Sequence, residues 1–177
     1  MSFPSLLDTD RRWMALALKE AEKAFDMGEV PVGAVVIRGN EIVGRGHNMV
    51  EQLQDPTAHA EIIAITAACQ TLGTKVLNGC TLYVTLEPCP MCAGAIVWSK
   101  LTRLVFGAFD EKAGSASTLY NIPQDPRLNH RVEIISGLEA DRSAALLQAF
   151  FRKRREKTGA ASPISGHGAG GDGVPYS

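Results

Sequence analysis

The sequence lacks any long apolar run. No stretch approaches the roughly 18 consecutive apolar residues that a membrane-spanning helix requires, so we expect no membrane span. The N-terminus also lacks a basic segment followed by an apolar one, since Asp8, Arg11 and Arg12 soon interrupt it. Because nothing marks secretion, we expect a cytoplasmic protein.

The chain has no excess of charge of either sign. Eighteen lysines and arginines stand against 19 aspartates and glutamates, for a net charge of −1. The chain as a whole therefore has no electrostatic attraction to nucleic acid or to a membrane surface, and any such affinity must arise from a local cluster. With 177 residues, of which 45% are apolar, the chain is long enough for one well-packed domain.

Hydrophobic periodicity and turn signals predict strands alternating with helices. This alternation indicates an α/β domain over residues 1–157, with one sheet sandwiched by helices. The segment 158–177 differs, because six of its twenty residues are glycine, and it predicts a disordered tail. We expect strands at 32–38, 41–47, 80–86, 103–109 and 131–136, and helices at about 13–27, 59–72, 90–98 and 138–157.

Cysteine is also scarce, and two of the four cysteines form a Cys-x-x-Cys pair, Cys89 and Cys92. In a reducing compartment such a pair is more typical of metal binding or redox chemistry than of a structural disulfide. The pair opens a predicted helix, so both sulfurs can face one point. His59 opens another predicted helix, and two thiolates with one imidazole suit zinc better than magnesium or calcium. Three protein ligands leave the fourth position of a tetrahedral zinc to water, as in catalytic sites.

Glu61 decides between an enzyme and a non-enzymatic protein. Two positions from His59, its carboxylate should reach a water on the metal and move protons as a general acid and base. The alternatives are a solvated glutamate beside a zinc-stabilised binding module, and a redox Cys-x-x-Cys pair with an ordinary histidine. Cys69 and Cys80 have no ligand spacing and are expected to be small buried hydrophobic residues.

With these residues in place, the chain resembles the cytidine deaminase superfamily of zinc enzymes, whose signature is His-x-Glu followed by Pro-Cys-x-x-Cys. Within it, the chain is most similar to the bacterial tRNA-specific adenosine deaminases, over about residues 10–157. The similarity is carried by six segments of the sequence, namely Glu29–Val35, Asp55–Glu61, Leu82–Cys89, Met91–Ala95, Asn129–Glu133 and Phe150–Arg152.

This resemblance implies a three-layer α/β/α domain with a central mixed five-stranded sheet, and deamination of adenosine to inosine at the wobble position of a tRNA anticodon by a homodimer. It implies one Zn²⁺ per subunit on His59, Cys89 and Cys92, with Glu61 as the catalytic acid and base. Further substrate contacts are implied for the side chain of Asn48, for Val30, for the backbone near Ala60 and Cys89, and for Asp110, beside the flanking nucleotide.

The end of the last predicted helix carries Phe150, Phe151, Arg152 and Arg154. Arginines suit phosphates and exposed aromatic rings suit the splayed bases of a single-stranded loop, although a solvated helix end with buried rings fits the same residues. The resemblance favours contacts with tRNA. A deaminase of a free nucleobase or nucleotide, of the guanine or cytidine type, is the alternative; it should have a small closed pocket and no affinity for tRNA.

Overall fold

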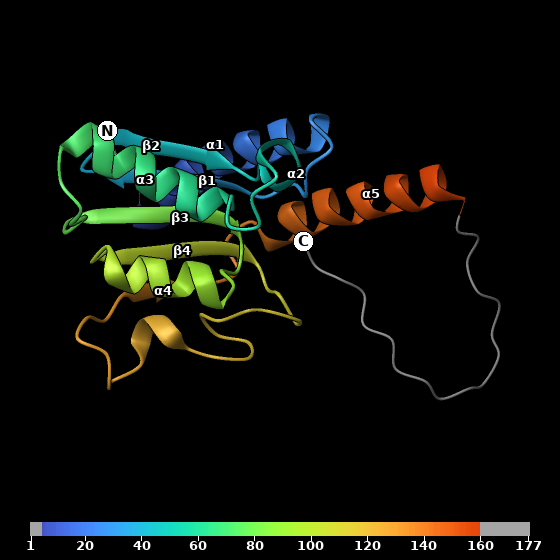
Figure 1. Cartoon of the computed structure of the whole chain (residues 1–177). Helices are drawn as coiled ribbons and strands as arrows, with labels where there is room; N and C mark the ends of the chain where they lie inside the picture. Colours follow the sequence, from blue (N-terminus) through green and yellow to red (C-terminus); the bar gives the residue numbers. More distant parts are fainter. Residues whose placement is uncertain (1–4, 160–177) are drawn as a thin grey trace.

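The computed structural model describes residues 5–159 of the chain, and its elements alternate between helix and strand (Figure 1). In chain order they are α1 (Leu6–Asp26), β1 (Gly33–Arg38), β2 (Glu41–His47), α2 (Val50–Leu53), α3 (Ala60–Leu72), β3 (Cys80–Leu86), α4 (Pro90–Trp98), β4 (Arg103–Ala108), the 3₁₀ turn η1 (Ile122–Gln124), β5 (Glu133–Ile135) and α5 (Ala140–Thr158).

The five strands form one mixed sheet in the order β2-β1-β3-β4-β5. Strand β1 is antiparallel to both β2 and β3, whereas the pairs β3–β4 and β4–β5 are parallel. Leu86 pairs with Ala108, so β3 and β4 end together at one edge of the sheet. In open α/β sheets, ligand sites lie outside this carboxyl edge of the strands.

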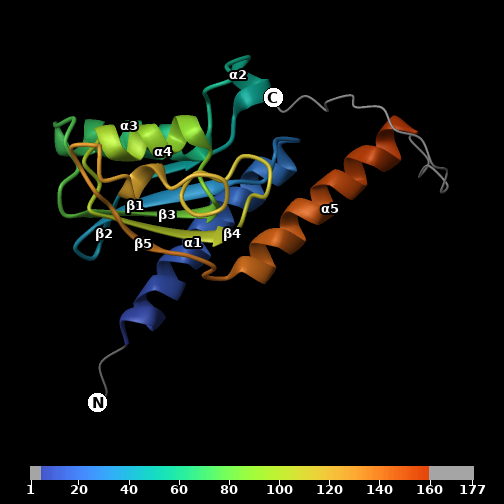
Figure 2. The same ribbon diagram turned by 90° about the horizontal axis from the view of Figure 1, so that it is seen from below.

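Helices cover both faces of the sheet, as Figure 2 shows from the side. Helices α3 and α4 lie on one face over a core that includes Ala64, Leu82 and Phe106. Helices α1 and α5 lie on the other face, where Trp13 packs against Val105. The C-terminal part of α5 continues beyond the sheet (Figures 1 and 2). The predicted three-layer α/β/α domain with a mixed five-stranded sheet is therefore confirmed.

Helix α3 lies directly on β2 because two glycines in that strand leave no side chain between them. A Cβ atom at Gly46 would lie 2.4 Å from the carbonyl oxygen of Ala60, and one at Gly44 would lie 2.2 Å from that of Ala64. Only glycine permits so close an approach of two backbones. The start of α3, which carries the predicted site residues His59, Ala60 and Glu61, is thus fixed against the sheet.

A buried ion pair joins α1 to the sheet on the opposite face. Asp10 accepts hydrogen bonds from both terminal nitrogens of Arg103, at 2.7 and 2.8 Å, and a third from the Tyr83 hydroxyl at 2.6 Å. Burial alone would raise the pKa of Asp10, but the hydrogen bonds from Arg103 and Tyr83 hold it below its ordinary value. This bidentate pair ties α1 to β3 and β4.

The structure corrects several predicted boundaries. Helix α1 begins seven residues earlier than expected, at Leu6, because Ser5 and Asp8 form a reciprocal capping box. The short elements α2 and η1 were not predicted, and β5 is shorter than expected. Most of the predicted tail, from residue 160 on, lies outside the described residues. No helix in the described part of the chain is long and apolar enough to cross a membrane.

Candidate active site

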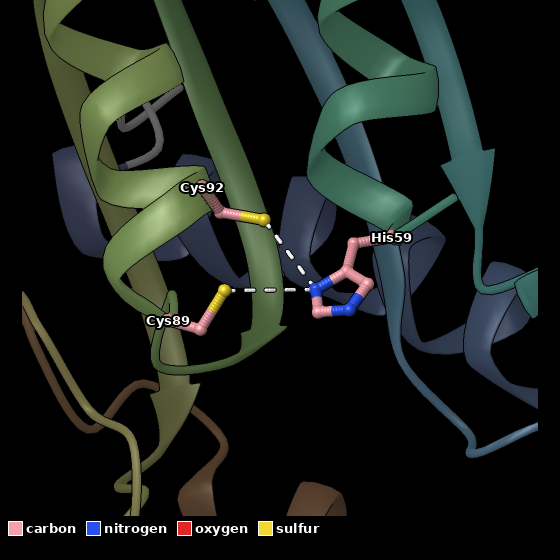
Figure 3. A group of neighbouring side chains, drawn as sticks. All are labelled: His59, Cys89 and Cys92. Carbon is pink, nitrogen blue, oxygen red and sulfur yellow. Dashed lines mark hydrogen bonds between the residues drawn. The ribbon is translucent and has the colours of Figure 1, made fainter. Parts of the chain in front are cut away.

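Three predicted metal ligands meet at the starts of two helices. His59 is the N-cap residue of α3, Cys89 is the N-cap residue of α4, and Cys92 lies in the first turn of α4. Their side chains point toward one another (Figure 3), with His59 Nδ1 at 3.7 Å from Cys89 Sγ and 3.5 Å from Cys92 Sγ. All three ligand atoms lie within 4.8 Å of one another.

This arrangement fits a zinc ion. Tetrahedral zinc with Zn–S near 2.3 Å and Zn–N near 2.0–2.1 Å separates a sulfur from a nitrogen ligand by about 3.6 Å. The two measured sulfur–nitrogen distances of 3.7 and 3.5 Å bracket that value. Two sulfurs and one imidazole are also a donor set that zinc accepts and that magnesium or calcium does not. The residues present therefore fit a three-ligand zinc site.

Of the three ligands, Cys89 is already disposed to lose its proton. Hydrogen bonds from Cys92 and His59 lower the pKa of Cys89 to about 4, although burial acts in the opposite direction. The hydrogen bond to Cys89, together with burial, raises the pKa of Cys92, which stays a thiol in this arrangement, and the hydrogen bond to Cys89 also raises the pKa of His59. The Cys89 thiolate is the form that binds metal, and a cation beside the pair would favour ionisation of Cys92 too.

Glu61 lies in the first turn of α3 with its side chain inside the protein, where only 3% of the residue is exposed. Burial raises its pKa to about 7. A carboxyl group with a pKa near neutrality can both accept and release a proton under physiological conditions, which a solvated glutamate does poorly. This burial argues against the alternative in which Glu61 is an ordinary surface residue.

These groups line one pocket of about 220 Å³ at the carboxyl edge of β3 and β4. It receives residues from the loops after α1, β2, β3 and β4, from the first turn of α3 and from α5. Of the residues predicted to form the site, seven line it: Val30, Asn48, His59, Glu61, Cys89, Asp110 and Arg154. Cys92 is fully buried and does not line the pocket, but its Sγ points at His59 from one turn farther along α4 (Figure 3).

Asn48 presents a hydrogen-bond donor to the pocket. Its Oδ1 accepts a hydrogen bond of 2.9 Å from the backbone N–H of Ala60, which fixes the orientation of the amide. Among residues 5–159, nothing accepts a hydrogen bond from its Nδ2, and Asn48 lines the pocket. Such an amide can donate to an acceptor atom of a ligand.

Comparisons with known proteins agree with this chemistry. Residues 8–155 match the model of the MafB19-like deaminase family. The chain belongs to this deaminase family. The tRNA-specific adenosine deaminase of Bacillus subtilis is 51% identical over 152 residues, which cover 86% of this chain and 94% of that protein.

Two solved structures share the fold of this chain. One, from a study of A-to-I editing by tRNA:A34 deaminases at the wobble position of transfer RNA, has a TM-score of 0.74 and 42% sequence identity, and covers 76% of this chain and 98% of that chain. Another, a mutant in complex with 8-azaguanine, has a TM-score of 0.70 and 26% identity, covering 81% and 85%. The predicted resemblance to the tRNA-specific adenosine deaminases is thus confirmed.

A second cavity, of about 300 Å³, adjoins the pocket in this family member. It shares Gly28, Glu51 and Arg154 with the pocket, and we name it the α5 cavity. Three of its lining residues, Lys153, Arg154 and Lys157, come from one face of α5. The prediction named Arg152 as well, but Arg152 lies on a different face of the helix and does not line the α5 cavity.

Two groups that were predicted to contact the substrate, the ring of Phe150 and the backbone N–H of Ala60, are engaged by other residues of the protein. Phe150 is only 6% exposed, because its ring packs edge-on against Phe25 at 5.9 Å and Phe151 at 5.4 Å. Little of the ring is available to stack on a base. The N–H of Ala60, expected to contact substrate or water, donates instead to Asn48. A backbone amide has one proton to donate, so Ala60 acts by orienting Asn48.

Sequence reasoning assigned no role to two other residues that line the pocket, Glu29 and Glu87. Both are glutamates flanked by apolar residues, Val30 after Glu29 and Leu86 before Glu87. A charged residue within an apolar run is the signal that could have identified them, because a glutamate is rarely buried without partners. Lys153 and Lys157 could have been found from their helical spacing with Phe150.

Proposed function

We propose that the protein deaminates adenosine to inosine at the wobble position of a tRNA anticodon. The observation that carries this proposal is one pocket in which the metal-ligand cluster, buried Glu61 and the Asn48 amide converge. The α5 cavity adjoins this pocket and is lined by three basic side chains, Lys153, Arg154 and Lys157, and by two acidic ones, Asp26 and Glu51. Membership of the deaminase family and the activity named for the relatives support the same reaction.

His59, Cys89 and Cys92 would hold the metal, which we propose to be one Zn²⁺ per subunit. Zinc, when bound, lowers the pKa of water toward neutrality and so supplies a nucleophile at physiological pH. The remaining work falls to the protein's own side chains. They orient the base, exclude bulk solvent and move protons.

Glu61 is the proposed proton carrier. As water adds to C6 of adenine, the carboxylate takes a proton from the water and delivers it to N1 of the ring. Glu61 then takes the proton of the new C6 hydroxyl and delivers it to the exocyclic nitrogen; the bond from C6 to that nitrogen breaks as the C6 carbonyl forms, and ammonia leaves. Each transfer needs a group that alternates between base and acid, and a pKa of about 7 suits both directions.

Asn48 and Val30 would orient the base. The free Nδ2 of Asn48 can donate to a ring nitrogen of adenine, and Val30 offers an apolar wall to its face. Asp110 lies at the pocket wall. Its Oδ1 accepts hydrogen bonds from the backbone N–H groups of Lys112 and Ala113, at 2.9 and 3.1 Å. Its Oδ2 would accept from a sugar hydroxyl of the flanking nucleotide, an acceptor role typical of carboxylates at RNA sites.

The α5 cavity would receive the RNA next to the flipped base. Lys153, Arg154 and Lys157 suit phosphates, which supply most of the sequence-independent affinity of nucleic-acid-binding proteins. The side chain of Lys153 also lies over the ring of Phe25, with Nζ at 5.1 Å from its centroid. Phe150 would support this face of α5 by packing beneath it, and Phe151 and Arg152, which do not line the α5 cavity, would contact other parts of the tRNA.

We also propose a homodimer. Helix α4 and the segment around η1 pack together and expose Met91, Trp98, Leu119, Tyr120 and Leu128. Trp98 is 79% exposed, which is unusual for the largest apolar side chain on a monomer surface. Burial of this face against a second copy would remove it from water.

The test is incubation of the zinc-loaded protein with an anticodon stem-loop carrying adenine at the wobble position, followed by detection of inosine. The alternative, a deaminase of free nucleobases, is tested in parallel with adenosine, guanine and cytidine. Its expected closed pocket does not match a pocket that continues into the α5 cavity. Glu61→Gln should retain zinc and fold but lose turnover by about 100-fold or more. An active Glu61→Gln would refute the assigned role, and conversion of guanine alone would refute the substrate.

A further inference from the structure

Two glutamates of the pocket wall bury their carboxylates completely. Glu29, after α1, is 2% exposed, and Glu87, after β3, is 1% exposed. Both line the pocket, yet neither belongs to the metal cluster. A buried carboxylate is costly unless hydrogen bonds satisfy its oxygens, so the partners of these two side chains indicate what they do.

Glu29 holds the short helix α2. Its Oε1 accepts a hydrogen bond of 2.8 Å from the N–H of Gln52, and its Oε2 accepts one of 3.2 Å from the N–H of Glu51. A helix of four residues has no stability of its own, and the N-cap residue Met49 gives α2 no side-chain cap. Glu29 therefore supplies the missing cap from a distant part of the sequence.

Glu87 holds the segment 110–118 in the same way. Its Oε1 accepts from the N–H groups of Ala116, Ser117 and Thr118, at 3.2, 2.7 and 2.8 Å. Its Oε2 accepts from the N–H of Asp110 at 3.1 Å and from the Thr118 hydroxyl. Five donors thus converge on one carboxylate, and they turn this segment around it.

The glycine in this segment leaves room for the carboxylate. A Cβ atom at Gly114 would lie 2.3 Å from Glu87 Oε2, so any larger residue would displace the side chain. Ser117 stands in the same segment, and its N–H donates directly to Glu87. Its φ is not positive, so a serine is accommodated there without strain.

Both segments contribute to the pocket wall. Val50 and Glu51 of α2 line the pocket, and so do Asp110 and Ala113 of the segment after β4. His59, Glu61 and Cys89 lie at the starts of α3 and α4, which pack on the sheet, so most of the contacts that place them are not made by the two glutamates. The segment 110–118 meets the metal-ligand region at one hydrogen bond, from the N–H of Ser115 to the carbonyl of Pro88 at 2.9 Å, so zinc content must be measured in every Glu87 variant.

We propose that Glu29 and Glu87 are positioning residues that hold these two wall segments at the spacing that admits the substrate base. The inference rests on the proposed function, since it concerns recognition by the same pocket. Each carboxylate converts a segment without regular structure of its own into a rigid wall. Loss of either should impair productive binding of the base more than the chemical step.

The variants Glu29→Gln and Glu87→Gln keep the shape of the side chain but replace one acceptor oxygen by an NH₂ group. That group faces N–H donors and cannot accept from them. We expect KM for the anticodon stem-loop to rise about tenfold, the factor that corresponds to one lost hydrogen bond to a charged group. kcat should fall by less than KM rises, and zinc content should stay at the wild-type value.

The matched control is Asp10→Asn, which neutralises an equally buried carboxylate on the opposite face of the sheet. It should lower stability without changing KM. Amide hydrogen exchange gives a second readout, in which residues 49–54 should lose protection in Glu29→Gln and residues 110–118 in Glu87→Gln. If Glu87→Gln does not fold, Thr118→Val removes one of its five donors and provides a milder form of the same test.

Wild-type KM together with wild-type protection of both segments would overturn the proposal. A tenfold fall in kcat with KM unchanged would also overturn it, because that result would indicate damage to the catalytic groups and not to the wall. If the wild-type protein forms no inosine, the proposed function fails. Hydrogen exchange in the two segments would still decide whether the glutamates hold them.

Discussion

Substitution of Gly46 by alanine should inactivate the protein from a position that does not touch the substrate. Gly46 lies in β2 under the first turn of α3, where a Cβ atom would meet the carbonyl oxygen of Ala60 at 2.4 Å and the backbone nitrogen of Ala64 at 2.7 Å. Both atoms belong to backbone and cannot rotate away. Helix α3 must therefore move off the sheet.

The size of this movement follows from the distances. Ordinary contact begins at 3.4 Å, so the 2.4 Å approach requires α3 to shift by about 1 Å. His59 and Glu61 flank Ala60 and move with it. A misplacement of about 1 Å at a catalytic group can cost about 100-fold in rate, and we expect kcat/KM to fall by that factor. Overpacking should also lower the free energy of unfolding by about 1–3 kcal/mol.

The assay is inosine formation in an anticodon stem-loop, measured with zinc content and the thermal midpoint of unfolding. The control is Gly94→Ala in α4, because a Cβ atom there meets nothing within 4 Å. That variant should keep full activity and should be stabilised slightly, since alanine favours helix. Wild-type kcat/KM in a folded Gly46→Ala protein would refute the claim that the β2–α3 spacing sets the catalytic geometry.

Three further predictions concern other parts of the molecule. Replacement of Lys153 and Lys157 by alanine should weaken tRNA binding and reduce the slope of log affinity against log salt by about 0.7 per lost phosphate contact, and an unchanged slope in a filter-binding titration would exclude those contacts. Asp10→Asn should lower the free energy of unfolding at pH 7 by about 3 kcal/mol, because Arg103 loses its buried partner. Since the folded pKa of Asp10 is depressed, the wild-type advantage should be present above about pH 4 and shrink as the pH falls below it, which urea unfolding at pH 3 to 7 would measure. Trp98→Glu should convert a dimer to a monomer in sedimentation equilibrium, and a wild-type protein that is monomeric at all concentrations would contradict the proposed interface.

Much of the fold could be predicted because its local signals agree with its final contacts. The β1–β2 hairpin, the starts of α3 and α4 and the metal ligands each follow from a few adjacent residues. Short-range spacing is enough to predict the metal ligands because His59 and Cys89 are each the N-cap residue of a helix. The order of the strands and the meeting of the two helix starts depend on long-range pairing, which periodicity alone does not specify.

The parts that were missed are held by distant residues. Helix α2 has no intrinsic helical signal, since its cap comes from Glu29, and the segment 110–118 turns around Glu87. The resemblance placed Phe150 at the RNA surface, although the sequence fits a buried ring equally well, and its ring packs against Phe25, far away in the sequence. In each case the deciding partner lies more than 20 residues away, beyond the reach of a local pattern.

The metal ligands lie at the starts of α3 and α4, and α5 lies on the opposite face of the sheet. The residues that carry out the reaction are therefore separate from those that select the substrate. The metal ligands and Glu61 come from one stretch, residues 59–92, whereas most of the other residues that line the pocket come from the segments before and after it. Substitutions in those flanking segments can change which nucleic acid or base is admitted while the deamination chemistry persists. Libraries aimed at new substrates should therefore vary residues 49–54, 110–118 and 153–157 and leave the metal ligands and Glu61 unchanged.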